Sequence, residues 1–163
     1  MNEKYARIAI IILIASYIIV AFPSFYPFPQ LTTKSLDIIL NNMDIGAVSE
    51  GTFLIVGFPE YSQIIQLSAE CSAIALFVMF LLGIFIVPKF SLKHRLMAIP
   101  FIIVIFLGNL LRILIGILLS IQWNHPEFII FFHDTFGQVI IFFWVIGSYI
   151  AWLKLTGNFP RIR

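Results

Sequence analysis

The sequence predicts an all-α membrane protein: a four-transmembrane-helix bundle with a short extracytoplasmic amphipathic helix and a β-hairpin. Hydrophobic residues make up 61% of the 163-residue chain and charged residues only 11%, with a mean hydropathy of +1.03. Soluble domains are about half apolar and a quarter charged. Apolar segments of membrane-crossing length recur along the chain, and the loops between them alternate between basic and acidic. The length fits one membrane domain covering residues 1–163.

The first predicted span covers residues 8–22 and follows Lys4 and Arg7. A basic start before a short apolar run also describes a secretory signal peptide. This run lacks an A-x-A cleavage site, and an aromatic, proline-rich segment follows it at 22–29. We therefore expect an uncleaved span, with the signal peptide as the alternative.

The segment 23–70 is the only long polar stretch and is predicted to lie outside the cell. Its first half contains apolar residues at i, i+3, i+4 and i+7, which indicates a short amphipathic helix. These residues are Leu36, Ile39, Leu40 and Met43. We expect this helix to lie on the membrane surface.

A β-hairpin is predicted in the second half of that segment. Two runs rich in β-formers, at 52–56 and 62–67, flank a turn that contains Gly57 and Pro59. The second predicted strand leads directly to Cys71.

Three further spans follow, at 72–87, 97–121 and 128–153. Pro88 ends the second span. Asn124 and Pro126 resemble a helix cap and first turn, and so mark the start of the fourth span.

The charges in the loops predict the orientation of the four spans. Basic residues lie at the start of the chain, between the second and third spans, and at the end: Lys4, Arg7, Lys89, Lys93, Arg95, Lys154, Arg161 and Arg163. The opposite loops carry six acidic residues and a single base, Lys34. Since basic loops stay inside, both termini are expected in the cytoplasm of a multi-pass cell-membrane protein. A net charge of +2 is too small to indicate a nucleic-acid partner.

Cys71, Arg112 and His133 are the residues that a purely structural membrane bundle explains least well. Counted at about 1.5 Å per helical residue from the inner end of each span, the three lie roughly 26, 26 and 31 Å away. A hydrocarbon core is about 30 Å thick, so all three are predicted at its outer boundary.

Each residue also has an ordinary structural interpretation. A lone cysteine is often a small core residue, a long arginine side chain can reach the surface, and a histidine can bond a neighbouring helix. Small residues line the same faces, with Gly108 and Gly116 beside Arg112. Another stripe is predicted on the fourth span: His133, Gly137, Ile140, Trp144 and Gly147. These stripes permit close helix approach with or without a site.

Together, the three side chains suit acyl transfer. A thiol next to a cationic His or Arg forms a thiolate more easily, a Cys–His pair is a standard nucleophile and base, and an arginine can stabilise an oxyanion. One cysteine excludes a dithiol redox cycle within one chain. No metal site or other cofactor is indicated, because the cysteine and the scattered histidines do not form a ligand set.

Three short segments, in this order and spacing, carry a resemblance to a known family: Glu70-Cys71-Ser72-Ala73, Asn109-Leu110-Leu111-Arg112 and His133-Asp134-Thr135-Phe136-Gly137. They resemble the signature segments of the exosortase/archaeosortase family, over about residues 50–150. Ala73 stands where the family often has Gly, and Glu70 where it often has a small residue. Many members have more spans, so this chain resembles a minimal four-span form.

The resemblance implies a membrane cysteine transpeptidase. Its expected partners are C-terminal sorting signals of secreted proteins, made of a motif, a transmembrane helix and a basic tail, and an acceptor such as a lipid or another amine or hydroxyl. Cys71 would be the nucleophile, Arg112 would stabilise the intermediate, and His133 would be the acid and base. The supporting residues are Asn109, Ser72, Gly137 and Asp134, of which Asp134 points about 100° away from His133 on a helix.

The alternative function is that of a non-enzymatic four-span membrane protein, such as a transporter subunit or an assembly partner. In that case Arg112 would be a packing or substrate-binding charge, and Cys71 would be replaceable. Covalent capture of a substrate by Cys71 distinguishes the two.

Overall fold

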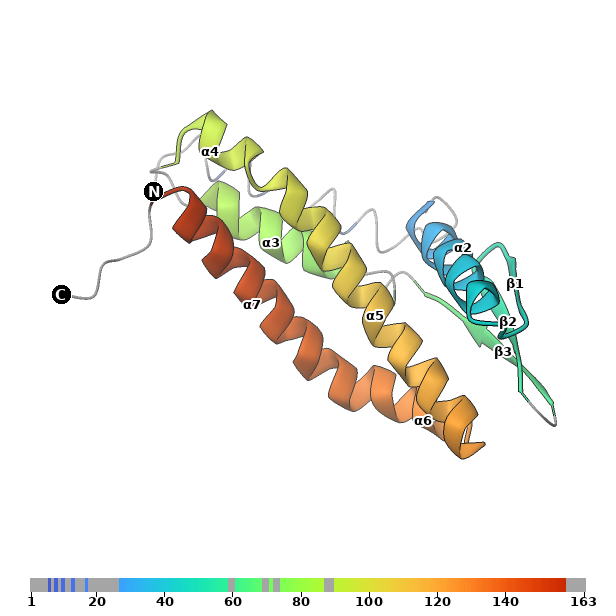
Figure 1. The fold of residues 1–163 in the computed structure, drawn as a ribbon. Coiled ribbons are helices and arrows are strands. Elements are labelled where there is room, and N and C mark those ends of the chain that lie inside the picture. The colour runs from blue at the N-terminus through green and yellow to red at the C-terminus, as the bar shows by residue number, and fades with distance from the viewer. Residues whose placement is uncertain are drawn as a thin grey trace.

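The structure is a computed structural model that describes residues 27–58, 61–68, 74–86 and 90–157, together with Cys71, residue 6 and four positions of the first predicted span (8, 10, 13 and 17). The predicted span 8–22 thus lies mostly outside the described residues. Figure 1 shows helical elements and one small sheet. In chain order they are α2 (Pro27–Asn42), β1 (Ala47–Glu50), β2 (Phe53–Gly57), β3 (Ser62–Gln66), α3 (Ile74–Ile86), α4 (Leu92–Leu96), α5 (Ile99–Trp123), α6 (Glu127–Phe131), η3 (Phe132–Phe136) and α7 (Gly137–Leu155).

The predicted hairpin is confirmed and belongs to a three-stranded antiparallel sheet in the order β1-β2-β3. β2 and β3 pair with Phe53 opposite Gln66 and Gly57 opposite Ser62. β1 was not predicted from the sequence, and it pairs with the other edge of β2. The alternation along β2 buries Leu54 and Val56 on one face of the sheet.

Helix α2 is longer than predicted, and its apolar face is covered by protein. Leu36 and Leu40 are fully buried in one cluster with Leu54 and Val56 of the sheet. The expectation that this helix lies on the membrane surface is therefore wrong for that face, because the sheet offers it a closer apolar partner. Met43, at the end of the predicted stripe, is exposed.

Two helical segments of the described chain are long and apolar enough to cross a membrane, Leu92–Trp123 and Gly137–Leu155. They correspond to the predicted third and fourth spans. The 25 residues of α5 extend over roughly 37 Å, which exceeds the thickness of a hydrocarbon core of about 30 Å. The apolar helix α3 accounts for 13 residues of the predicted second span. The four-span arrangement itself stays a prediction.

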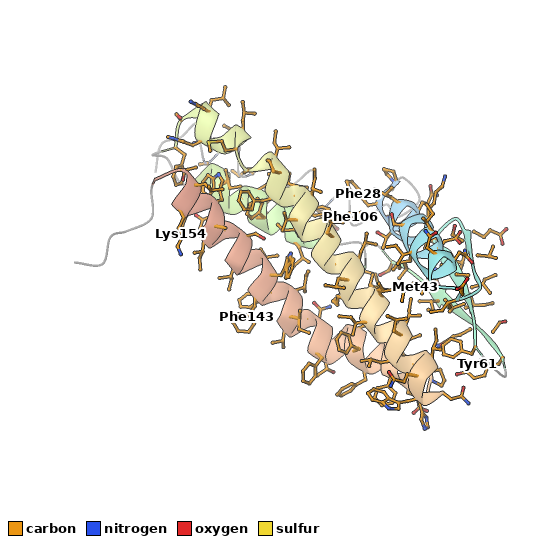
Figure 2. All side chains as sticks on the ribbon, in the orientation of Figure 1. Phe28, Met43, Tyr61, Phe106, Phe143 and Lys154 are labelled. Carbon is orange, nitrogen blue, oxygen red and sulfur yellow. The ribbon has the colours of Figure 1, made fainter. Side chains whose placement is uncertain are left out.

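α5 and α7 run side by side and antiparallel, and they define two ends of the molecule (Figure 1). At one end, the Trp152 indole N–H donates to the His94 carbonyl of α4 over 2.9 Å. At the other end are α6 and the sheet, with α2 packed on it. Figure 2 shows Lys154 and Tyr61 at these opposite ends.

The buried face of α7 differs from the predicted stripe. Its buried residues are Gly137, Ile141, Ser148 and Trp152, whereas Ile140 is 41% exposed and Gly147 has open space around it. Trp144 does contact α5, since its indole N–H donates to the Val104 carbonyl over 2.9 Å. The predicted stripe advances by alternating steps of four and three residues, whereas successive buried residues are four, seven and four positions apart. This longer average repeat turns the buried face away from the predicted stripe towards the C-terminal end of α7.

Candidate active site

Helix α5 brings two of the predicted site residues to one buried face. Asn109 is fully buried and Arg112 is 3% exposed. The predicted stripe that includes Gly108, Arg112 and Gly116 is buried along its whole length, which confirms its inward orientation. An arginine is rarely buried without a polar environment, so this face of α5 is where polar chemistry is expected.

Cys71 lies in the short connection between β3 and α3, and its backbone is fixed on both sides. Its N–H donates to the Ser68 carbonyl over 3.1 Å. Its carbonyl accepts a buried hydrogen bond of 2.7 Å from the Asn109 side-chain amide. The side chain is 9% exposed. Asn109 thus acts on Cys71 through the backbone and not on its sulfur.

Among the described residues, Ser68 and His133 are polar neighbours of the Cys71 thiol. The Ser68 hydroxyl lies 3.3 Å from the sulfur, and His133 forms a hydrogen bond with the thiol. Burial raises the pKa of Cys71, but the hydrogen bond and charge of His133, together with Ser68, more than offset this, so the pKa lies below its ordinary value. Such a thiol forms the thiolate more readily than an isolated cysteine.

His133 is carried by η3, a π-helical turn that was predicted to be ordinary α-helix. The segment α6–η3–α7 runs without a break from Glu127 to Leu155. Single π turns inside α-helices often occur at functional sites. The sequence has no simple signal for such a turn, since the apolar pattern of the segment is compatible with an α-helix throughout.

Gly137 ends this turn at a very close approach to α5. A Cβ atom at Gly137 would lie 2.8 Å from Cδ of Arg112, and closer still to the Phe132 carbonyl oxygen. Only glycine leaves the Arg112 side chain room to pass at this point. Gly137 is thus in close contact with Arg112, and its supporting role in the site stays a prediction.

One cavity of about 260 Å³ brings the three chemistry-bearing residues together. Cys71, Arg112 and His133 all line it, with apolar residues of α5 and α6 and with the strand β3. The β3 side is formed by Gln63, Ile64, Ile65, Gln66 and the following Leu67.

Two of the predicted supporting residues are not placed by the structure. Ser72 lies outside the described residues, and of Asp134 only the backbone position in η3 is described. Conversely, Ser68 and the lining residues of β3 were missed. The only signal for Ser68 was its position three residues before Cys71, one turn in a helical or 3₁₀ conformation.

A family model described as transmembrane exosortase matches residues 3–150. The chain belongs to the transmembrane exosortase family. Membership implies a membrane protein with cysteine-dependent transpeptidase activity that acts on C-terminal sorting signals, and the predicted resemblance is confirmed. No curated protein and no solved structure matches the chain.

Proposed function

We propose that this exosortase cleaves the C-terminal sorting signals of secreted proteins through a thioester on Cys71 and transfers the product to an acceptor such as a lipid. The observation that best supports this function is the shared cavity. The cavity is lined by Cys71, whose thiol has a lowered pKa, and by His133, which forms a hydrogen bond with that thiol. The buried Arg112 lines the same cavity. This is the set of groups that acyl transfer requires.

The first half of the proposed reaction forms the thioester. The Cys71 thiolate attacks the carbonyl carbon of the scissile peptide bond, and an S–C bond forms as the carbonyl π electrons move to oxygen. Arg112 stabilises the resulting oxyanion. The C–N bond then breaks, and protonated His133 gives its proton to the leaving amine. The C-terminal helix of the substrate departs with that new amine.

The second half returns the enzyme to its starting state. The O–H or N–H of the acceptor attacks the thioester carbonyl, and His133 takes up the proton. The S–C bond breaks, which releases the acylated acceptor and restores the thiolate. No electrons are gained or lost overall, so the proposed cycle needs no redox partner.

We place this chemistry at the outer face of the cell membrane, in a single four-span domain with both termini in the cytoplasm. The position of the basic residues supports this orientation. The basic residues of α4 and Lys154 of α7 lie at the end of the molecule opposite to α6 and the sheet (Figure 2). Basic segments favour the cytoplasmic side.

The test compares the C-termini of secreted proteins from cells with the parental enzyme and with Cys71→Ala. We expect at least one precursor, with an apolar helix and a basic tail still attached, to accumulate in the variant. Ser120→Ala is the matched control, because it also removes one buried heavy atom, on α5 and outside the cavity, and should process at the parental rate. Parental processing by Cys71→Ala would refute the enzyme and favour the non-enzymatic alternative.

A further inference from the structure

The outer edge of β3 carries backbone groups that face away from the sheet. In an antiparallel pair, residues alternate between bonding the partner strand and pointing their N–H and C=O outward. The Leu67 N–H donates to the Thr52 carbonyl, and the Phe58 N–H donates to the Tyr61 carbonyl. With the register of β2 and β3, Gln63 and Ile65 therefore face β2. The backbone groups that face outward belong to Ser62, Ile64 and Gln66.

The opposite edge of the sheet is closed by side chains of α2. The outward N–H of Ala47 donates to the Asn41 amide oxygen over 3.2 Å, and the Asn41 amide nitrogen donates to the Ala47 carbonyl over 2.8 Å. The outward N–H of Ser49 donates to the Asp37 carboxylate over 3.1 Å. Proteins commonly block edge strands to prevent unwanted pairing. Here β1 is blocked, while no strand of the described chain pairs with the outer edge of β3.

The open edge lies in the wall of the cavity that holds Cys71. Residues 63–67 line that cavity together with Ile129 and Ile130 of α6. The outward-facing Ile64 and Gln66 are among these lining residues, so the open edge and the Cys71 thiol share one cavity.

We propose that the substrate segment immediately before the scissile bond binds as a fourth strand on the outer edge of β3. This inference rests on the function proposed above and names how the substrate is recognised. An extended peptide gains main-chain hydrogen bonds from such an edge, while pockets beside the strand select alternate side chains. The occupant is a peptide in extended conformation, and the reason for this choice is that the edge and the reactive thiol share one cavity.

The chemistry also determines the direction of the added strand. In the thioester, the carbonyl of the last retained residue is bonded to Cys71, so the retained chain extends from there towards its own N-terminus. β3 leads to Cys71 at its carboxyl end. The substrate strand therefore runs parallel to β3, with its carboxyl end at the thiol.

Ile64→Pro tests the role of the edge directly. Proline removes the outward N–H of residue 64, and the pairing with β2 stays intact because the bonds to β2 come from Gln63 and Ile65. The probe is the precursor whose processing requires Cys71. We expect its processing to fall about tenfold or more, while iodoacetamide alkylates Cys71 at the parental rate. Parental processing by Ile64→Pro would overturn the proposal and leave the transpeptidase function intact.

A cross-linking experiment decides the matter if the proline variant does not accumulate. A photoreactive phenylalanine analogue replaces Ile64 or, as the control, Val48 on β1, in the Cys71→Ala background. The two positions are similarly exposed, at 66% and 61%. We expect the precursor to be captured from position 64, through residues just before its cleavage site, and not from position 48. Equal capture at both positions would overturn the strand proposal, whereas processing that does not depend on Cys71 would overturn the function itself.

Discussion

The Cys71 thiol is subject to two opposing effects that a substitution at His133 can separate. Burial raises its pKa, and the hydrogen bond and charge of His133 lower it. His133→Ala removes the lowering contribution and leaves the burial, so the pKa should rise. The rate of alkylation by iodoacetamide should fall at pH 7, and its midpoint should move to higher pH, because less thiolate is present at each pH.

His125→Ala is the control for this measurement. His125 lies in the turn between α5 and α6, outside the cavity, so its removal should leave the alkylation profile in place. A His133→Ala profile that overlies the parental one would contradict the assigned interaction.

Gly137 and Gly147 of α7 allow a controlled comparison of two glycine-to-alanine substitutions. A Cβ at Gly137 would overlap Arg112 and the Phe132 carbonyl, whereas a Cβ at Gly147 meets nothing within 4 Å. Gly137→Ala should therefore displace Arg112 and lower processing of the precursor by about 100-fold, the usual cost of losing an oxyanion donor. Gly147→Ala should retain activity and stabilise α7 by about 0.5–1 kcal/mol.

Activity assays and thermal unfolding in detergent check this pair. Full activity in Gly137→Ala would mean that Arg112 has a second accessible position and that the close approach is not required.

At this scale, the candidate reactive residues could be selected from the sequence, whereas the contacts around them could not. A lone cysteine, an arginine and a histidine inside apolar spans stand out by their cost in a membrane. The Ser68 contact depends on the fold of one irregular turn, and the bond from Asn109 to the Cys71 carbonyl joins residues 38 positions apart. Neither leaves a periodic pattern in the sequence.

Among the elements, η3 determines which way His133 faces. Deleting Thr135 should convert the π turn to a regular α-helix, since it removes the one extra residue of that turn. Relative to α7, His133 would then rotate by about 100° and lose its bond to Cys71. We expect loss of processing and slower alkylation of Cys71 at pH 7, with α7 still inserted.

Thr135→Ala is the control for the deletion, because the Thr135 side chain is exposed and the substitution leaves the turn unchanged in length. Processing by the deletion variant at the parental rate would contradict this role of η3.

The elements that were predicted are those with a strong local pattern. The hairpin has two β-branched runs around Gly57 and Pro59, and α5 and α7 are long apolar runs. β1 was missed because Ala47–Glu50 is short and its hydrophobic content is low. The apolar face of α2 was predicted to contact the membrane. An amphipathic stripe shows which face of a helix is apolar, but it does not show whether a sheet or a lipid surface covers that face.

For the whole molecule, the proposed orientation predicts which end an impermeant maleimide reaches. Since Cys71 is the only cysteine, Cys71→Ala provides a background for single-cysteine variants. Ile64→Cys and Leu92→Cys place a thiol at opposite ends of the molecule, at sites with parental exposures of 66% and 71%. In intact cells, the reagent should label Ile64→Cys and should label Leu92→Cys only after the membrane is permeabilised. The reverse pattern would refute the topology.

That the molecule is a membrane protein was the easiest property to predict from the sequence, because its composition alone excludes a soluble domain. The arrangement of the helices was not accessible. Apolar helices in lipid have no strong hydrophobic preference for a particular neighbour, so the choice of face depends on individual contacts such as the Trp144 indole on the Val104 carbonyl.

Helix α5 forms hydrogen bonds with the two segments that carry the proposed reacting groups. Asn109 holds the turn that carries Cys71, and Val104 accepts the indole N–H of α7, the helix continuous with His133. Transmembrane helices tilt when a bilayer is thicker or thinner than their apolar length. With α5 as a common reference frame, the thiol and the imidazole would tilt together. The alignment of these two groups should therefore be insensitive to lipid chain length, even where the depth of the site in the bilayer is not.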